Sequence, residues 1–240
     1  MQGERLSRWK KWSRLGIGLV GLVLAAAAGA YFYFRAYSPD RAAYPIRGID
    51  VSHHQKEIAW QRVAADDVSF AIIKASEGGD WVDRLFARNL QEARAAGLAV
   101  GAYHFYRFCR PPADQAKNFI DTVPRDQPLL PPVVDIEFHG NCERRPSVEE
   151  MRAELAEFLA PVEAAFGKPA IIYLIGEAEE MYSAAMPDRH RWVRAIVQHP
   201  GHENWVYWQF HNRGRVDGIV GDVDLNVLQG GDDVLRNLAK

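Results

Sequence analysis

Short apolar runs alternate with amphipathic stretches through most of this 240-residue chain. Branched and aromatic residues bounded by turn residues are typical of β-strands, whereas apolar positions three or four apart indicate helices. On this basis we expect strands at residues 47–53, 70–75, 99–108, 131–138, 170–174, 191–196, 205–210 and 223–228. We expect helices at residues 58–65, 83–96, 113–122, 147–166 and 177–184.

This alternation predicts an α/β fold, with a mainly parallel sheet and helices outside it. Eight strands suggest a modified TIM-like β/α barrel of about eight strands. The last three strands leave little room for helices between them, so we expect helices to be missing in the last third of the barrel. Ser147 and Glu150 form the sequence of a capping box, and Gly97 and Gly167 are placed to end two helices.

Polar residues lie near the ends of nearly all the predicted strands. In α/β barrels the active site lies at the carboxyl ends of the strands, so this fold brings distant polar residues to one mouth. The set comprises Asp50, Glu77, His104, Tyr106, Asp135, Glu137, Tyr173, Gln209 and Asp224. Four of its members are carboxylates from well-separated positions: Asp50, Asp135, Glu137 and Asp224. Taken singly, Asp50 and Asp224 are equally consistent with turn or cap residues.

The run 131–138 places two acids within one apolar strand. Side chains two apart share a face of a strand, so Asp135 and Glu137 face one way while Val134, Ile136 and Phe138 face the other. One interpretation is an edge strand with solvated acids. The other is a paired-acid site, in which burial and mutual repulsion separate the two pKa values, leaving one group protonated and one charged.

The N-terminus has a different composition from the rest of the chain. Residues 1–14 are rich in Lys and Arg, and the uncharged run 15–34 is long enough to span about 30 Å as a helix. Its aromatic end and basic flank predict a single-pass anchor with the N-terminus in the cytoplasm. A cleaved signal peptide is the alternative, with residues 28–30 as the small-residue cleavage site. Residues 35–45 are then a linker, and residues 46–240 the barrel domain.

Either alternative exports the barrel. With the uncleaved anchor, which the length and aromatic end of the run favour, we expect it at the cytoplasmic (inner) membrane, facing the periplasm or the exterior. The composition of the whole chain is that of an ordinary globular protein, with 48% hydrophobic residues, 25% charged residues and a formal net charge of −2. This near-neutral balance gives no support for nucleic-acid binding.

Several of these segments resemble, in order along the chain, the motifs of glycoside hydrolase family 25 lysozymes, which cleave bacterial peptidoglycan. The segment 48–55, Gly-Ile-Asp-Val-Ser-His-His-Gln, resembles their opening motif. The other matching segments are 70–78, 101–106, 133–137, 171–173, 208–210 and 223–226. Together they cover about residues 46–228. The N-terminal run lies outside the family's core pattern and bears on location alone.

The resemblance implies a modified β/α barrel with no cofactor that hydrolyses the β-1,4 bond from N-acetylmuramic acid to N-acetylglucosamine. It implies Glu137 as the general acid/base, with Asp135, Asp50 and Asp224 around the same sugar. It also implies retention of configuration, with the substrate's 2-acetamido group as nucleophile and Asp135 orienting it. Spacing alone does not settle the stereochemistry, because a Cβ separation of roughly 6–7 Å along a strand lies between the two usual carboxyl separations.

Other side chains near the strand ends have two interpretations each. Tyr106, Tyr173 and Trp208 either stack on sugars or pack in the core. Lys74 and Glu77 either hydrogen-bond the substrate or pair with each other. His104 and Gln209 are expected to contact the substrate. The histidines show no HExxH or other spaced ligand set, so we expect no metal.

The two cysteines, Cys109 and Cys142, follow the third and fourth predicted strands. Neighbouring parallel strands bring both to one rim, and an exported compartment is oxidising, which favours a disulfide that braces the loops. The alternative is two free thiols.

We expect a monomeric enzyme that acts on peptidoglycan glycan strands. A chitinase-like glycosidase is one alternative, although Val133 stands where the DxxDxDxE strand of those barrels has an acid. A wall-binding module without turnover is another; the four intact acids argue against it.

Overall fold

The computed structural model describes residues 2–201 and 204–240, with side chains described from residue 18 onward. The chain divides into two compact units, the first ending at Ser38 and the second running from Pro39 to Lys240.

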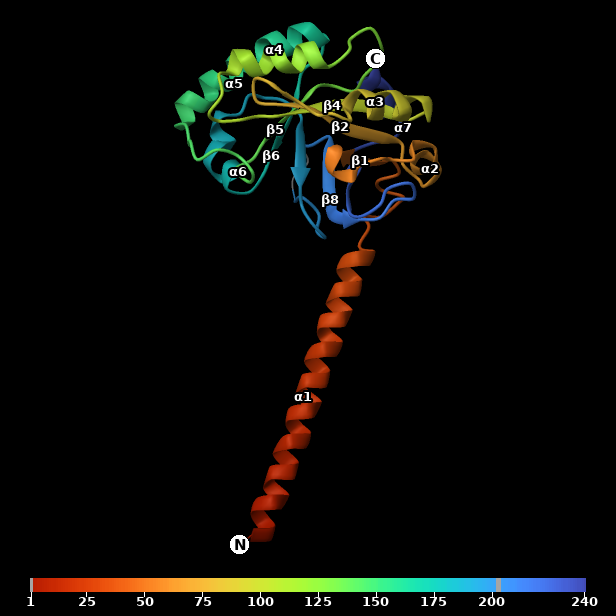
Figure 1. Cartoon of the computed structure of the whole chain (residues 1–240), viewed down its shortest axis with the longest axis vertical. Coiled ribbons are helices and arrows are strands. Elements are labelled where there is room, and N and C mark those ends of the chain that lie inside the picture. Colours follow the sequence, from red (N-terminus) through yellow and green to blue (C-terminus); the bar gives the residue numbers. More distant parts are fainter. Residues whose placement is uncertain (1, 202–203) are drawn as a thin grey trace. The chain divides into compact units, whose positions relative to one another are not determined.

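Eight strands of the second unit close into a barrel (Figure 1). Around the barrel they are β1 (Arg47–Val51), β2 (Phe70–Glu77), β4 (Ala99–Phe105), β5 (Val133–Ile136), β6 (Ile171–Leu174), β7 (Arg191–Arg194), β8 (Tyr207–Gly214) and β9 (Val223–Leu228). Pairing of β1 with both β2 and β9 completes the closure. The predicted β/α barrel is therefore confirmed. A two-residue strand, β3 (Trp81–Val82), which was not predicted, pairs antiparallel with the end of β2.

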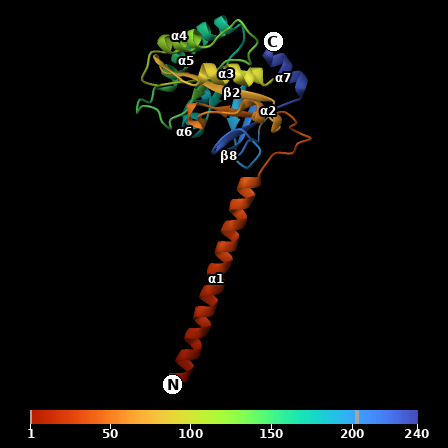
Figure 2. The same cartoon turned by 45° about the vertical axis from the view of Figure 1, so that its right-hand side comes forward.

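Helices cover the outside of this barrel. They are α2 (Trp60–Ala65), α3 (Phe86–Ala95), α4 (Pro112–Thr122), α5 (Val148–Phe166), α6 (Gly176–Tyr182) and α7 (Asp232–Ala239), with single turns of 3-10 helix at His53–Gln55 and Ser183–Ala185. Two views show α4 and α5 side by side on the outer side of the strands (Figures 1 and 2). In the described chain no helix lies between β7 and β8 or between β8 and β9.

The longest helix of the barrel unit, α5, begins and ends where the sequence predicted. Ser147 accepts a hydrogen bond from the Glu150 backbone, and the Glu150 side chain accepts one from the Ser147 backbone. Gly167 ends the helix in the left-handed region, with φ of 66°. A side chain would be strained there, which explains why glycine occupies the position. The C-terminal helix α7 was not predicted.

The last strand, β9, runs antiparallel to both of its neighbours, β1 and β8. All other neighbouring pairs in the closed barrel are parallel. The start of β9 therefore lies beside the carboxyl end of β1, and Asp224 is the register partner of Asp50. The predicted parallel character is thus correct for most of the sheet, and the reversal of β9 is what brings Asp224 to the barrel mouth.

Alternation along each strand separates two apolar clusters. Inward-facing side chains such as Phe70, Ile72 and Tyr207 fill the closed end of the barrel, and outward-facing ones pack under the helices. Gly48 makes the first of these clusters possible, because a Cβ there would lie 2.3 Å from the Phe70 ring. Each fully buried large side chain contributes about 1.5–3 kcal/mol relative to exposure. The polar inward-facing residues lie at the other end of the barrel.

Residues 39–45, predicted to form part of a linker, pack against the barrel. The Arg47 side chain donates to the Pro39 carbonyl at 2.7 Å. The Tyr44 hydroxyl lies 3.0 Å from His199 Nε2, and its ring meets Trp208 edge-on at 5.5 Å between centroids. This segment therefore covers part of β8 where helices are missing.

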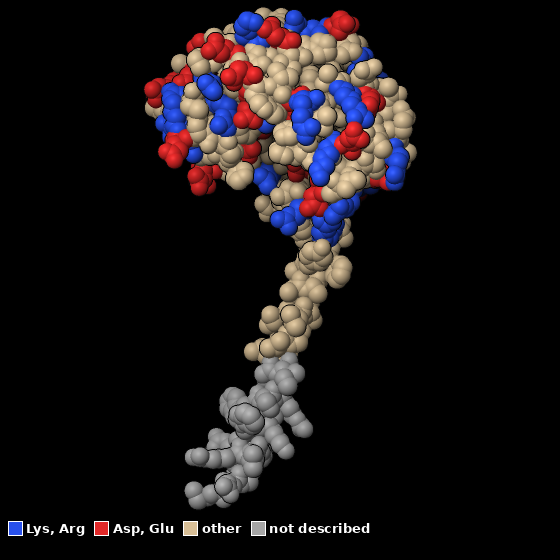
Figure 3. All heavy atoms as spheres, viewed as in Figure 1, with Lys and Arg blue, Asp and Glu red and all other residues tan. Residues whose placement is uncertain are grey.

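The first unit is a single helix, α1 (Gln2–Ala36). Its part Gly18–Ala36 is long and apolar enough to cross a membrane, and a signal sequence has the same properties. From residue 18 to residue 34 it carries no Lys, Arg, Asp or Glu, and it is tan in Figure 3. The predicted basic tail, residues 1–14, lies outside the residues whose side chains are described. On the barrel unit, by contrast, acidic and basic side chains are interspersed over the face shown (Figure 3).

Candidate active site

Asp50 lies at the centre of a buried hydrogen-bond network in the barrel mouth. Its Oδ2 accepts from Asn226 Nδ2 at 2.7 Å and from Gln209 Nε2 at 3.1 Å, and its carboxyl group is hydrogen-bonded to that of Asp224. A hydrogen bond between two carboxyl groups requires a proton on one of them. Burial raises the pKa of Asp50 to about 6, and burial together with the Asp50 charge raises the pKa of Asp224 to about 9. Asp224 is therefore the donor and Asp50 the charged acceptor at neutral pH.

Two aromatic side chains orient the amides that bind Asp50. Trp192 Nε1 donates to Asn226 Oδ1 at 2.8 Å, and the Tyr173 hydroxyl donates to Gln209 Oε1 at 3.0 Å. An indole N–H can only donate, so it must meet the amide oxygen, which turns the Asn226 NH₂ group toward Asp50. The expected substrate contacts Gln209 and Tyr173 thus lie in the mouth, where they position a carboxylate.

Asp135 and Glu137 share the inward face, as predicted, while Val134, Ile136 and Phe138 pack in the outer cluster. Asp135 is only 8% exposed, and its Oδ1 has no hydrogen-bond partner among the described residues. Burial, and then the nearby Glu137 charge, raises the pKa of Asp135. An unpaired buried carboxylate oxygen is costly unless a ligand completes it.

Glu137 follows the last residue of β5 and is less enclosed than Asp135. Burial raises its pKa, and the positive charge of Arg194 is the largest effect that opposes this rise. Its backbone carbonyl accepts from Asn141 Nδ2 at 3.0 Å, which fixes the turn after the strand. A carboxyl group with a raised pKa and access to solvent has the properties of a general acid.

Sequence reasoning missed two residues close to these acids. Tyr103, on the inward face of β4, has a pKa raised well above its usual value by burial and by the charges of Asp135 and Asp50. Arg194, at the end of β7, lowers the pKa of Glu137 through its charge. The period of two along β4, counted back from an inward Phe105, would have identified Tyr103; Arg194 had no comparable signal.

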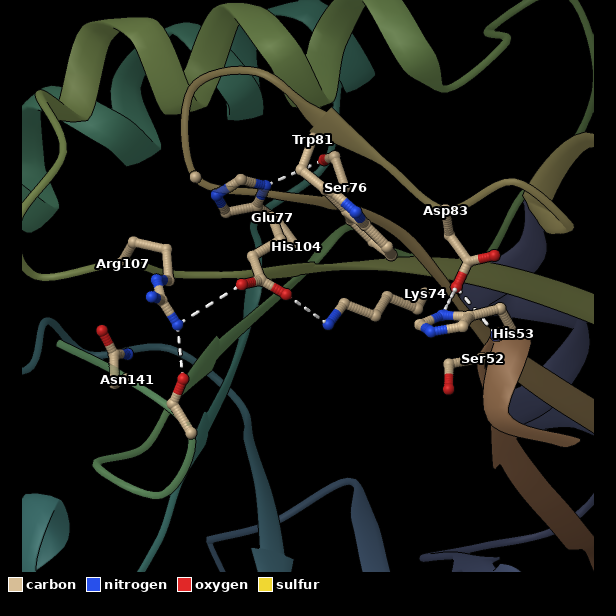
Figure 4. Close-up of polar contacts among 12 residues, drawn as sticks. Ser52, His53, Lys74, Ser76, Glu77, Trp81, Asp83, His104, Arg107 and Asn141 are labelled. Carbon is tan, nitrogen blue, oxygen red and sulfur yellow. Dashed lines mark hydrogen bonds and ion pairs between the residues drawn. The ribbon is translucent and has the colours of Figure 1, made fainter.

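The alternative of a Lys74–Glu77 ion pair is confirmed (Figure 4). Lys74 Nζ lies 2.8 Å from Glu77 Oε2, and Arg107 Nη1 lies 3.4 Å from Glu77 Oε1. Residues three apart normally face opposite sides of a strand. A bulge between Lys74 and Ser76 in β2 shifts the register and puts both partners on the same side. Lys74 Nζ also lies 4.7 Å from the centroid of the Phe105 ring.

A second pair lies beside this one in Figure 4. Asp83 Oδ2 accepts from the backbone N–H of His53 at 2.8 Å and contacts His53 Nδ1 at 2.9 Å. The His53 ring packs against Trp81 with 5.4 Å between centroids. Asp83 therefore orients His53 next to a Trp81 side chain that is part-exposed.

Three predicted substrate contacts lie buried on the outer side of the barrel. The prediction for His104 is wrong, and for Tyr106 and Trp208 the structure agrees with the alternative of core packing. His104 is fully buried between Ser76 and Gln115, with 2.8 Å from Nδ1 to Ser76 Oγ and 3.2 Å from Nε2 to Gln115 Oε1. Burial lowers its pKa to about 3. The Tyr106 hydroxyl donates to Glu154 of α5 at 3.3 Å.

Trp208 is the third residue that lies on the outer side. Its Nε1 donates to the Ala195 carbonyl at 2.9 Å on the outer face of β8. The physical reason is that side chains alternate between the two faces of a strand. Tyr103 and Phe105 face inward on β4, as do Tyr207 and Gln209 on β8, so the residues next to them in the chain face outward.

The predicted disulfide is present between Cys109 and Cys142, with 6.3 Å between their Cα atoms. Further bonds hold the same loop to the end of β4. Asn141 Nδ2 donates to the Tyr106 carbonyl at 2.7 Å, and Arg144 Nη1 donates to the Phe108 carbonyl at 2.6 Å. The loop after Glu137 is therefore tied to the segment after β4 by a disulfide and by side-chain hydrogen bonds.

A pocket of about 490 Å³ opens beside Glu137. Its lining comes from the loop after β5, from the start of α6 with the residue before it, and from the end of β7. It comprises Glu137, Phe138, His139, Arg145, Ile175, Gly176, Glu177 and Arg194.

A closed β/α barrel with four carboxyl groups in its mouth and an open pocket beside the least buried of them defines a glycoside hydrolase. The family model described as "Glycosyl hydrolases family 25" matches residues 49–219. The chain belongs to this family.

Relatives and solved structures agree with this assignment. The chain is 38% identical over 216 residues to the protein YegX of Escherichia coli (strain K12), covering 83% of this chain and 78% of that one. It is 35% identical over 203 residues to Lysozyme M1 of Streptomyces globisporus, covering 77% of this chain and 68% of that one. A family 25 glycosyl hydrolase structure from Bacillus anthracis superposes with a TM-score of 0.77 at 34% identity, covering 85% of this chain and 97% of that one.

Proposed function

We propose that the protein is a muramidase that hydrolyses the β-1,4 bond from N-acetylmuramic acid to N-acetylglucosamine in peptidoglycan, with Glu137 as general acid/base. The observation that carries this proposal is the arrangement of the carboxyl groups. Asp50 and Asp135 are buried within the mouth, whereas Glu137 borders the open pocket. A bound sugar can reach Glu137 from the pocket while its ring lies against the deeper acids.

In the first step, Glu137 transfers its proton to the glycosidic oxygen as the bond to the anomeric carbon breaks. The unpaired Oδ1 of Asp135 accepts the N–H of the substrate's 2-acetamido group, whose carbonyl oxygen attacks the anomeric carbon. In the second step, ionised Glu137 takes a proton from water, which attacks the same carbon and releases the acetamido oxygen. The result is hydrolysis with retained configuration.

Asp50 supplies negative charge close to the developing oxocarbenium ion. The donors Asn226 and Gln209 and the Asp224 proton all stabilise its ionised form. Because these groups are already oriented before substrate binds, they require no reorganisation in the transition state.

We also propose that α1 is an uncleaved single-pass anchor that holds an exported barrel at the cytoplasmic membrane. The uncharged run from residue 18 to residue 34 and the basic residues before it support this orientation. The disulfide suits an oxidising compartment. Membrane fractions washed with alkaline carbonate should retain the full-length chain. A shorter soluble chain beginning after residue 30 would indicate a cleaved signal peptide instead.

The enzymatic proposal is tested with the detergent-solubilised full chain on purified peptidoglycan, followed by mass analysis of the soluble fragments. We expect reducing-end N-acetylmuramic acid. Reducing-end N-acetylglucosamine would contradict the bond assignment, cleavage of chitin in preference to peptidoglycan would indicate a chitinase-like enzyme, and binding without products would indicate a wall-binding module.

A further inference from the structure

Arg145 holds a fixed position at the edge of the pocket beside Glu137. Its guanidinium carbon lies 3.9 Å from the centroid of the Phe138 ring, a cation–π contact. Its Nη1 donates to the carbonyls of Cys142 at 2.6 Å and Arg144 at 2.9 Å. These contacts leave the edge formed by Nε and Nη2 without a hydrogen-bond partner among the described residues. That edge is one of the two that bind a carboxylate through parallel hydrogen bonds.

The loop that carries Arg145 is held in place from several sides. Cys142 is bonded to Cys109, and Asn141 Nδ2 donates to the Glu137 carbonyl at 3.0 Å. Arg107 Nη1 donates to the Gly140 carbonyl. A guanidinium on such a loop loses little freedom when it binds a ligand, so more of the interaction free energy is retained as affinity.

Arg194 lines the same pocket from the end of β7. No carboxylate of the described residues lies within ion-pair distance of Arg145 or Arg194. The carboxyl groups lining the pocket are those of Glu137 and Glu177. When Glu137 carries the proton that it transfers, the pocket lining keeps one charged carboxyl group, that of Glu177, and Arg194 also interacts with the charge of Asp50. Arg145 is then the guanidinium group best placed to attract an anion.

We propose that Arg145, assisted by Arg194, binds a carboxylate of the substrate beside the bond that Glu137 cleaves. This inference rests on the proposed muramidase function and adds its specificity. Muramic acid carries a lactyl group that ends in a carboxylate or in a peptide with carboxylates of its own. A chain of N-acetylglucosamine alone has no such group. The pocket therefore selects glycan chains with carboxylate-bearing substituents over uncharged ones.

The test compares two forms of one soluble substrate: peptide-bearing glycan strands, and the same strands with their carboxylates converted to neutral amides. The measured quantity is the ratio of kcat/KM for the native form to that for the amidated form. We expect a ratio of roughly three to ten for the wild-type full chain, since charged hydrogen bonds at exposed sites such as Arg145 have effects of about that size. The ratio should fall as ionic strength rises.

Arg145→Ala should bring this ratio close to one, chiefly through a higher KM for the native form. Arg145→Lys keeps the charge but loses the two-bond geometry, and should give an intermediate ratio. The matched control is Arg236→Ala, which removes an exposed arginine from α7 and should keep the wild-type ratio. A wild-type ratio near one, or an unchanged ratio in Arg145→Ala, would overturn the proposal. The wild-type measurement needs no variant, so a wild-type ratio near one refutes the proposal even if Arg145→Ala does not fold.

Failure of the muramidase proposal gives a different result, because neither form of the substrate is then cleaved. Equilibrium binding of both forms to the Glu137→Gln full chain still tests the pocket in that case. Tighter binding of the native form supports a carboxylate site, and equal binding of the two forms refutes it.

Discussion

The carboxyl groups of Asp50 and Asp224 are hydrogen-bonded to each other at the seam where antiparallel β9 closes the barrel on β1. They lie 174 positions apart in the chain and are direct register partners. Their shared proton leaves one negative charge at the base of the mouth, fixed in place by two amide groups.

Replacing Glu137 by Gln removes the proton donor while keeping its size and much of its hydrogen bonding. We expect kcat on peptidoglycan to fall by roughly 10²–10⁴-fold, the usual contribution of general acid–base catalysis. Glu157→Gln is the matched control, because Glu157 is an exposed glutamate of α5 that does not line the pocket. Near wild-type turnover by Glu137→Gln would refute the acid assignment.

Asn226→Ala removes the shorter of the two amide hydrogen bonds to Asp50, at 2.7 Å. That bond lowers the pKa of Asp50, so its loss should raise the pKa further above about 6. Less Asp50 is then ionised in mildly acidic solution, and the acidic limb of the kcat profile should move to higher pH. Trp192→Phe, which keeps the Asn226 amide but removes the indole donor that orients it, should give a smaller shift in the same direction. Superimposable pH profiles for all three proteins would contradict the role given to this network.

The contribution of Asp224 to the stability of the barrel should fall as pH rises between about 4 and 9. Burial raises the pKa of Asp224 from 3.8 to about 9, so the folded chain retains a proton that the unfolded chain releases above about pH 4. The stabilisation is fully present below pH 3.8 and is lost as pH rises through about 9. The slope is at most roughly 1.4 kcal/mol per pH unit for one proton.

Denaturant unfolding of the wild type and Asp224→Asn at pH 6 and pH 8 measures this effect. Asn cannot release a proton, so the stability difference between the two proteins should change with pH in the variant's favour. A difference that is the same at both pH values would show that the proton is not held.

Cys142→Ser removes the covalent link between the loops after β4 and β5. Closing a loop of 33 residues predicts a loss of about 2–4 kcal/mol in unfolding free energy. Activity should fall as well, because the same loop carries the contacts that fix the Glu137 carbonyl and Arg145. Thiol titration of the denatured, unreduced wild type should find no reactive groups; two would show that the bond does not form.

Much of this protein follows from its sequence. The apolar runs located all eight barrel strands, because each is short, rich in branched residues and bounded by turns. The paired acids Asp135 and Glu137 share a face because they are two apart, and the two cysteines meet because they follow neighbouring parallel strands.

The tertiary structure decided which side chains reach the mouth. A strand pattern has a period of two but no marker of which phase faces inward, and pairing with distant strands sets that phase. For this reason His104, Tyr106 and Trp208 face outward, although each lies next to an inward-facing residue. The bulge in β2 and the reversal of β9 are likewise products of long-range pairing, and they bring Glu77 to Lys74 and Asp224 to Asp50. The local sequence thus determined which chemical groups are available, and barrel closure determined which of them meet.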